Sequence, residues 1–262
     1  MTKFDEATQA IRVDDQTYDV CLDPGYAIGG PLNGGYLMAV ILRAAVDASP
    51  FEHPVSTSTQ FLKAPVAGPA RVMIEPLKAG RTAAFARARL IQNDVPQIEA
   101  LITTATLTGA APDFSGEPPA LPPIEECGKL PDPKPESGMT LNAQMDLRFD
   151  PPTIGWLSGA PSGRPESRAY FRMAEEQDPD PYVLALAVDA LPPVVFSAGH
   201  RGWAPTVDLT WHLRAVPAPG WLTLSAGGRL IADGWFDEEV EVWDSAGRLV
   251  AQSRQLARVG RG

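Results

Sequence analysis

The sequence predicts an α+β protein built from two similar halves, each with an antiparallel sheet around one buried helix. Three observations support this fold class. A Pro- and Gly-rich segment divides the 262-residue chain near its middle, the two halves share one strand pattern, and each half contains one helix-length apolar run. Hydrophobic residues make up 44% of the chain and charged residues 21%, which is a composition that can form a sizeable core.

The dividing segment contains Glu117-Pro118-Pro119, Leu121-Pro122-Pro123 and Pro131-Asp132-Pro133-Lys134-Pro135. Proline fixes φ and lacks an amide donor, so neither a helix nor a strand fits there. We therefore expect an N-terminal domain over residues 1–109, a semi-rigid linker over 110–138 and a C-terminal domain over 139–262.

The two halves follow one pattern at an offset of 151 residues. Residues 56–64 lie over residues 207–215, each stretch enters a Pro/Gly turn, and Thr104 lies over Gln255 at the same offset. A register shared over this length indicates a duplication. The alternative is two unrelated antiparallel sheets that have similar hairpins.

Alternating or β-rich runs predict the strands of both halves. They cover residues 71–75, 85–90, 221–225, 240–243 and 248–251. Asp244-Ser245-Ala246-Gly247 is typical of a hairpin turn. We expect one antiparallel meander in each half.

One apolar helix precedes each meander. The first is expected over residues 36–46, after Asn33-Gly34-Gly35. The second is expected over residues 182–191, with Asp180 as its N-cap, Pro181 at its first position and Pro192-Pro193 after its end. A helix that is apolar on all sides is a buried helix. A sheet curled around one buried helix is the hotdog arrangement, so the two halves predict a double hotdog.

Charge and motifs exclude several classes of function. The net charge of -10 argues against nucleic-acid binding, and no apolar run approaches the roughly 20 residues of a membrane span. The polar, acidic start shows no signal peptide, and two cysteines make neither a disulfide framework nor a zinc site, which favours the cytoplasm. Motifs for zinc hydrolysis, phosphate-binding loops, dinucleotides and serine hydrolases are missing from the sequence. We expect no metal, and chemistry based on carboxylates, amides, hydroxyls and backbone donors.

Asp189 is the only charged residue of the second predicted helix. Its neighbours Ala187, Val188, Ala190 and Leu191 offer no polar partner, and the last turn of a helix disfavours negative charge. Both effects raise the pKa of a carboxyl group toward the range that suits a general base. The alternative is a helix end that projects into solvent.

Two further polar residues belong to predicted strands. Thr206 heads a strand in which alternation places Thr206, Asp208 and Thr210 on one face. Gln255 lies in the last strand. Taken alone, the threonine is explained by strand propensity and the glutamine by solvation.

Together these residues lie in a pattern that resembles the type II acyl-CoA thioesterases, a double-hotdog family that hydrolyses acyl-CoA thioesters. The matching segments are Asp189 followed by Ala-Leu-Pro-Pro, Thr206-Val207-Asp208 with Trp211, residues 214–221, the ending over residues 244–255, Gly34-Gly35-Tyr36 and Gln60-Phe61-Leu62-Lys63. The resemblance implies that Asp189, Thr206 and Gln255 are catalytic. The chain departs from the family at Leu209, where a histidine is frequent, and over residues 227–235.

The resemblance also implies a mechanism and partners. A water activated by Asp189 would attack the thioester without a covalent intermediate, and no cofactor is expected because CoA is part of the substrate. The backbone amides of Gly34 and Gly35 are candidates for binding the substrate carbonyl, with a simple strand-to-helix turn as the alternative. The family suggests a homo-oligomer, although two hotdogs in one chain also permit a monomer.

Basic residues in the first half are the candidates for contact with CoA phosphates. They are Lys63, Lys78, Arg81, Arg87 and Arg89. A solvated sheet surface is the favoured alternative for them.

Two other functions stay open at this point. One is an acyl-CoA binding module that lacks turnover, since fold does not fix function. The other is a hotdog enoyl-CoA hydratase, which needs an Asp and a His in a G-D-x-N-P-x-H loop that this sequence lacks.

Overall fold

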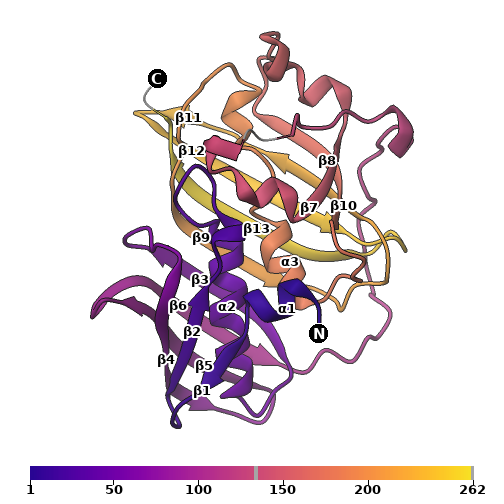
Figure 1. Ribbon diagram of the computed structural model, residues 1–262. Coiled ribbons are helices and arrows are strands. Elements are labelled where there is room, and N and C mark those ends of the chain that lie inside the picture. The colour runs from indigo at the N-terminus through magenta and orange to yellow at the C-terminus, as the bar shows by residue number, and fades with distance from the viewer. Residues whose placement is uncertain (133–134, 261–262) are drawn as a thin grey trace.

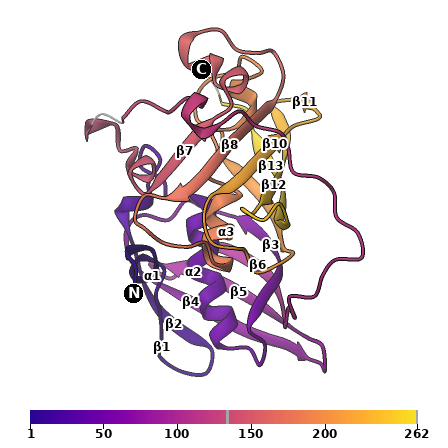
Figure 2. The ribbon, with the colours of Figure 1, turned by 90° about the vertical axis from the view of Figure 1, so that its right-hand side faces the viewer.

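A single antiparallel sheet curves around two central helices, α2 (Gly34–Asp47) and α3 (Pro181–Ala187), in the computed structural model (Figure 1). The structure describes residues 1–132 and 135–260. Figure 2, turned by 90°, shows both helices enclosed on the concave side of the sheet. The predicted α+β fold, with one buried helix in each half, is confirmed.

The elements of the first half are α1 (Lys3–Ala7), β1 (Ala10–Arg12), β2 (Thr17–Leu22), β3 (His53–Phe61), β4 (Gly68–Ala79), β5 (Ala83–Gln92) and β6 (Val95–Ala105). Those of the second half are β7 (Met145–Phe149), β8 (Glu166–Met173), β9 (Thr206–Leu213), β10 (Leu222–Gly227), β11 (Ile231–Ala232), β12 (Trp235–Trp243) and β13 (Leu249–Arg258). All the predicted strand segments fall on these strands, with differences of one residue at some ends. The strands before each helix, β1, β2, β7 and β8, were not predicted.

The order of strands in the sheet bears out the duplication. It runs β1-β2-β4-β5-β6-β3-β9-β13-β12-β10-β8-β7, so β2, β4, β5, β6 and β3 correspond in mirrored order to β8, β10, β12, β13 and β9. At the offset of 151 residues, β5 falls on β12 to within one residue. The two predicted meanders are one sheet, because β3 pairs with β9 through Ser58–Thr210 and Thr59–Leu209.

Helix α2 is buried as its composition predicts. Every residue from Gly35 to Leu42 is buried, and the helix begins at the N-cap Asn33, whose side chain accepts a hydrogen bond from the Tyr36 amide. Burial on all sides is possible because α3 covers one side and the curved sheet covers the others. The first turn of α2 lies against the last turn of α3, where a Cβ on Gly35 would lie 2.5 Å from the Ala185 carbonyl oxygen.

Helix α3 is shorter than predicted, since it ends at Ala187 and not near residue 191. Beyond Ala187 the chain forms a turn whose hydrogen bonds join residues three apart, as in the bond from the Asp189 amide to the Leu186 carbonyl. Pro192 forces Leu191 away from helical geometry, and the helix ends ahead of it. Asp189 therefore follows the helix and is not part of its last turn. The predicted N-cap is confirmed, because Asp180 accepts hydrogen bonds from the Tyr182 and Val183 amides.

The Pro-rich segment contains neither helix nor strand over residues 106–123. Three short 3₁₀ turns follow it: η2 (Ile124–Glu126), η3 (Pro135–Ser137) and η4 (Thr140–Ala143). Residues 133 and 134 of the predicted linker lie outside the described residues. The domain limits at 109 and 139 stay a prediction, since the two halves share one sheet.

No helix in the described part of the chain is both long enough and apolar enough to cross a membrane.

We predict that Gly35→Ala destabilises the fold by about 1–3 kcal/mol, the usual range for overpacking a core. The added methyl would press on the Ala185 carbonyl oxygen and on Asp189 Cβ, which would lie 3.0 Å away. Gly227→Ala is the matched control, because a Cβ there meets nothing within 4 Å. Urea denaturation measures both. Equal free energies of unfolding for the two variants would contradict the close helix contact.

Candidate active site

Asp189 lies where the end of α3 meets the N-terminus of α2. Asn33 Nδ2 donates to Asp189 Oδ2 (2.9 Å) and to the Asp189 carbonyl oxygen (2.8 Å), and the Gly35 amide donates to Oδ2 (2.9 Å). The expectation that Asp189 has no polar neighbours is therefore wrong. Its donors come from the other half of the chain, so its own flanking sequence could not reveal them.

These surroundings set the proton affinity of Asp189. Burial raises its pKa to about 6, against the opposing effect of the Gly35 and Gly34 amides and of the Asn33 side chain. The opposing groups belong to the N-terminus of a 14-residue helix, which favours negative charge. The side chain is partly exposed. Two of the three hydrogen bonds described above end on Oδ2 and one ends on the backbone carbonyl oxygen, so these bonds leave Oδ1 able to accept a proton near neutral pH.

The Gly34 and Gly35 amides were expected to face a substrate carbonyl. The Gly35 amide donates to the Asp189 carboxylate instead, so its role here is to hold that carboxylate. A carbonyl-binding role for Gly34 stays a prediction. The glycine at 35 is required by the close approach of α3, as shown above.

Thr206 and Gln255 lie together on the buried side of the sheet. Thr206 Oγ1 donates to Gln255 Oε1 at 2.6 Å, although strict alternation placed Thr206 with Asp208. Asp208 instead accepts a hydrogen bond from the exposed Gln60 side chain. The pairing of β9 with β13 skips Val207, and such an irregularity turns the next side chain toward the other face.

Glu238 is a buried acid in this site that the sequence analysis missed. It is 2% exposed, and its Oε1 accepts a hydrogen bond from Gln255 Nε2 at 2.8 Å. Its Oε2 accepts one from the Val194 amide, at the start of η7 (Val194–Phe196), also at 2.8 Å. Burial raises the pKa of Glu238 to about 7, and the charge of Asp189 adds to that rise. The two acids are thus close enough for their charges to interact.

The sequence does contain a signal for Glu238. In β12, Phe236, Val240 and Val242 face the core at alternate positions, and Glu238 occupies the same phase. An acid in the apolar phase of an alternating strand indicates a special partner. Asn33, the other missed residue, fits the N-cap preference, but its reach to Asp189 depends on how α2 and α3 pack.

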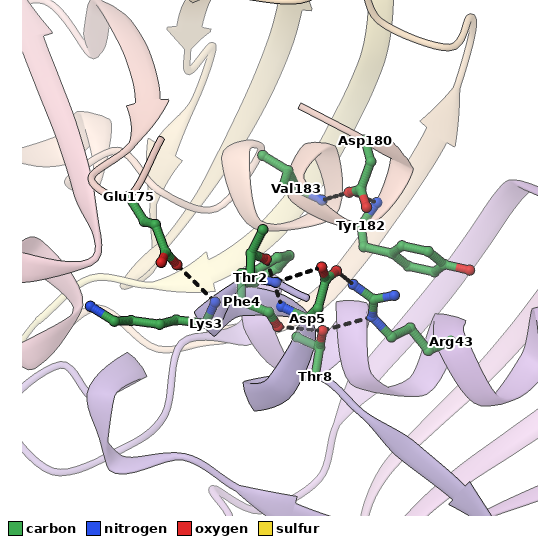
Figure 3. A network of polar contacts seen from close by, with 10 residues as sticks. All are labelled: Thr2, Lys3, Phe4, Asp5, Thr8, Arg43, Glu175, Asp180, Tyr182 and Val183. Carbon is green, nitrogen blue, oxygen red and sulfur yellow. Dashed lines mark hydrogen bonds and ion pairs between the residues drawn. The ribbon is translucent and has the colours of Figure 1, made fainter. Parts of the chain in front are cut away.

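The opposite end of the α2–α3 contact holds a different, charge-compensated network (Figure 3). There Arg43 of α2 lies over the Tyr182 ring at 4.2 Å and binds Asp5 Oδ1 at 2.6 Å and Thr8 Oγ1 at 2.7 Å. Helix α1, which carries Asp5, covers this end. At this end the Asp5 carboxylate is paired with the Arg43 guanidinium, whereas Asp189 is held by the neutral amides of Asn33 and Gly35.

The basic residues of the first half include two that are already paired. Arg87 and Arg89 both bind Glu75, at 3.3 and 3.6 Å, and Arg89 also approaches Glu99. These contacts favour a solvated sheet surface for that pair. Lys63, Lys78 and Arg81 are exposed. Contact of any of the five with CoA phosphates stays a prediction.

Comparison with protein families matches both halves of the chain. Residues 22–108 match the acyl-CoA thioesterase N-terminal domain, and residues 124–259 match the acyl-CoA thioesterase C-terminal domain.

The chain is also similar to individual proteins along nearly its whole length. A candidate thioesterase II from Thermobifida fusca YX has a solved structure with 42% sequence identity and a TM-score of 0.91, covering 100% of this chain and 98% of that chain. An uncharacterised protein of Mycobacterium tuberculosis is 32% identical, over 91% of this chain and 89% of its own. A protein of unknown function with a hot dog fold from Alicyclobacillus acidocaldarius has a TM-score of 0.85 at 19% identity, covering 100% of this chain and 99% of that chain, which shows the fold alone.

We predict that Asp189→Asn raises Tm at pH 8 by roughly 2–4 °C and changes it less at pH 4. The folded pKa of about 6 lies above the unfolded value of about 3.9, so the folded state binds more protons between them and loses stability as pH rises. Asparagine removes that loss, and its oxygen can still accept from Asn33 and Gly35.

Asp146→Asn is a control of opposite sign for this measurement. The Arg148 guanidinium holds the pKa of Asp146 below its usual value, so this carboxylate stabilises the fold above its unfolded pKa. Its replacement should lower Tm at pH 8. A Tm of Asp189→Asn that falls at pH 8 would contradict the raised pKa of Asp189.

Proposed function

The chain belongs to the acyl-CoA thioesterase family, and from that premise we propose that it hydrolyses acyl-CoA thioesters to the free acid and CoA. The observation that carries the proposal is a partly exposed carboxylate with a raised pKa, in the same site as a threonine–glutamine pair. We propose Asp189 as the general base, Thr206 as a water-binding residue and Gln255 as its partner. Their hydrogen bonds and burial support these roles.

Asp189 is suited to remove a proton from water. A base is most effective when its pKa lies near the working pH, and burial brings that of Asp189 to about 6. Asn33 and Gly35 hold Oδ2, so the carboxylate has one fixed orientation, and we assign proton removal to Oδ1. A fixed base and water lower the entropic barrier to attack.

Thr206 is suited to orient the same water. Its hydroxyl proton is donated to Gln255 Oε1, so the lone pairs of Oγ1 are available to accept. A water that donates one proton to Asp189 and the other to Thr206 would direct a lone pair at the thioester carbon. Gln255 acts through Thr206 in this scheme.

The proposed reaction balances without a cofactor. The water oxygen forms a bond to the carbonyl carbon, and its proton passes to Asp189. The tetrahedral intermediate then breaks its C–S bond, and CoA leaves as a thiolate. The proton on Asp189 returns to the thiolate or to solvent, which restores the carboxylate.

We expect Asp189→Asn to lower the rate of thiol release from acyl-CoA by about 10²–10⁴, the usual contribution of a positioned base. Thiol release from acyl-CoAs of several chain lengths measures this. Asp180→Asn is the matched control, since asparagine also caps helices and Asp180 lies at the other end of α3. Folded protein that binds acyl-CoA tightly without thiol release would instead favour a binding module.

We also expect kcat/KM to rise with pH up to about 6 and then to level. Asp189 must be ionised to act as a base, so activity is lost as pH falls through its pKa. Initial rates between pH 4.5 and 8 give this profile. The rising limb should be absent from the residual activity of Asp189→Asn, and its persistence there would remove Asp189 from the role of base.

A further inference from the structure

A row of hydrogen bonds runs from Thr206 through Gln255 to Glu238 in the core. Which group donates and which accepts along this row is fixed at Glu238. The Val194 amide can only donate, and it occupies Glu238 Oε2. When Glu238 is ionised, its other oxygen can only accept, so Gln255 presents Nε2 to it and Oε1 to Thr206. Thr206 must then donate its proton inward. Its oxygen is left to accept a hydrogen bond from the water.

We propose that Glu238 is a positioning residue for thioester hydrolysis, which fixes the orientation of the Gln255 amide and through it the direction of the Thr206 hydroxyl. The inference rests on the proposed function. It adds a residue that touches neither water nor substrate and that the catalytic set of Asp189, Thr206 and Gln255 does not contain.

A glutamate is required at this position because two donors converge on it. A carboxylate accepts at both oxygens, whereas a glutamine side chain accepts at one and donates at the other. In Glu238→Gln the Val194 amide would take the single oxygen, and the new NH₂ would face Gln255. Gln255 would turn its own oxygen toward residue 238 and its NH₂ toward Thr206. The Thr206 proton would then point at the water.

Glu238 also has an electrostatic neighbour in the site. Asp189, just after α3, is the charged group that acts on it from another element, and Gln255 and the Val194 amide are its neutral partners. Glu239, the next residue of β12, is more exposed and binds Arg229 and Arg254. Glu239 therefore provides a matched position for the same substitution outside the row.

The first test compares Glu238→Gln with Glu239→Gln by steady-state kinetics. We expect Glu238→Gln to lose roughly 10- to 100-fold in kcat with KM changed less than about threefold, since the water is misoriented but the acyl-CoA contacts remain. Glu239→Gln should keep the wild-type kcat. Wild-type kcat in folded Glu238→Gln would overturn the inference.

The second test is the exchanged pair Glu238→Gln with Gln255→Glu. There the Val194 amide donates to the oxygen of the new amide at position 238, and the NH₂ of that amide donates to the new carboxylate at position 255. Thr206 again donates inward, to the same carboxylate. We expect this double variant to recover at least about tenfold of the kcat lost in Glu238→Gln. A folded double variant that is no faster than Glu238→Gln would overturn the inference, because a purely packing role gives no reason for rescue.

A third measurement does not depend on turnover. The side-chain amide of Gln255, identified in a ¹⁵N–¹H spectrum by its loss in Gln255→Met, should shift as Glu238 titrates between pH 5 and 8. Asp189→Asn shows whether that shift comes from Glu238 alone. A shift of the Gln255 resonance that persists in Asp189→Asn and is absent in Glu238→Gln supports the inference. This holds even if the wild-type protein releases no thiol, because that result would contradict only the proposed function. If the pH-dependent shift of the Gln255 amide resonance were the same in wild type and in Glu238→Gln, the inference would be overturned.

Discussion

The site depends on holding one carboxylate at the contact between two helices from different halves of the chain. An unpaired buried carboxylate is costly, so Asp189 requires donors, and the N-terminus of α2 supplies them through Asn33 and Gly35. That supply requires α2 and α3 to touch closely, which only a glycine at 35 permits. The packing of the core and the ionisation of Asp189 therefore have a common cause.

Duplication explains why the site lies between the halves. The sheet is continuous through β3 and β9, so the two helices face each other across an approximate twofold axis. Such an arrangement offers two helix contacts of the same kind. One holds Asp189 with α2 amides, and the other holds Arg43 with Asp5 under α1. A few side chains therefore distinguish the contact of the proposed active site from the Arg43 network.

Local sequence pattern predicted much of the fold, because periodicity reflects burial. The all-apolar run of α2, the N-cap of α3 and the Asp244–Gly247 turn required no knowledge of distant residues. Asp189 was also predictable, as a charge in an apolar run. The inward turn of Thr206 and the partners of Asp189 depend on packing between residues 49 to 156 positions apart. The pairing of β3 with β9 likewise depends on the register between strands of the two halves.

The two acids of the site differ in how their oxygens are used, and this difference separates their roles. Both pKa values are raised, so above pH 7 each acid reduces the stability of the fold relative to a neutral residue. Glu238 has a donor on each oxygen and is buried, so the proposed mechanism gives it no proton transfer to the substrate. Asp189 is held through Oδ2 and is partly exposed, and the proposed mechanism uses its Oδ1 to take a proton from water. The proposed mechanism therefore assigns proton transfer to Asp189 and orientation to Glu238.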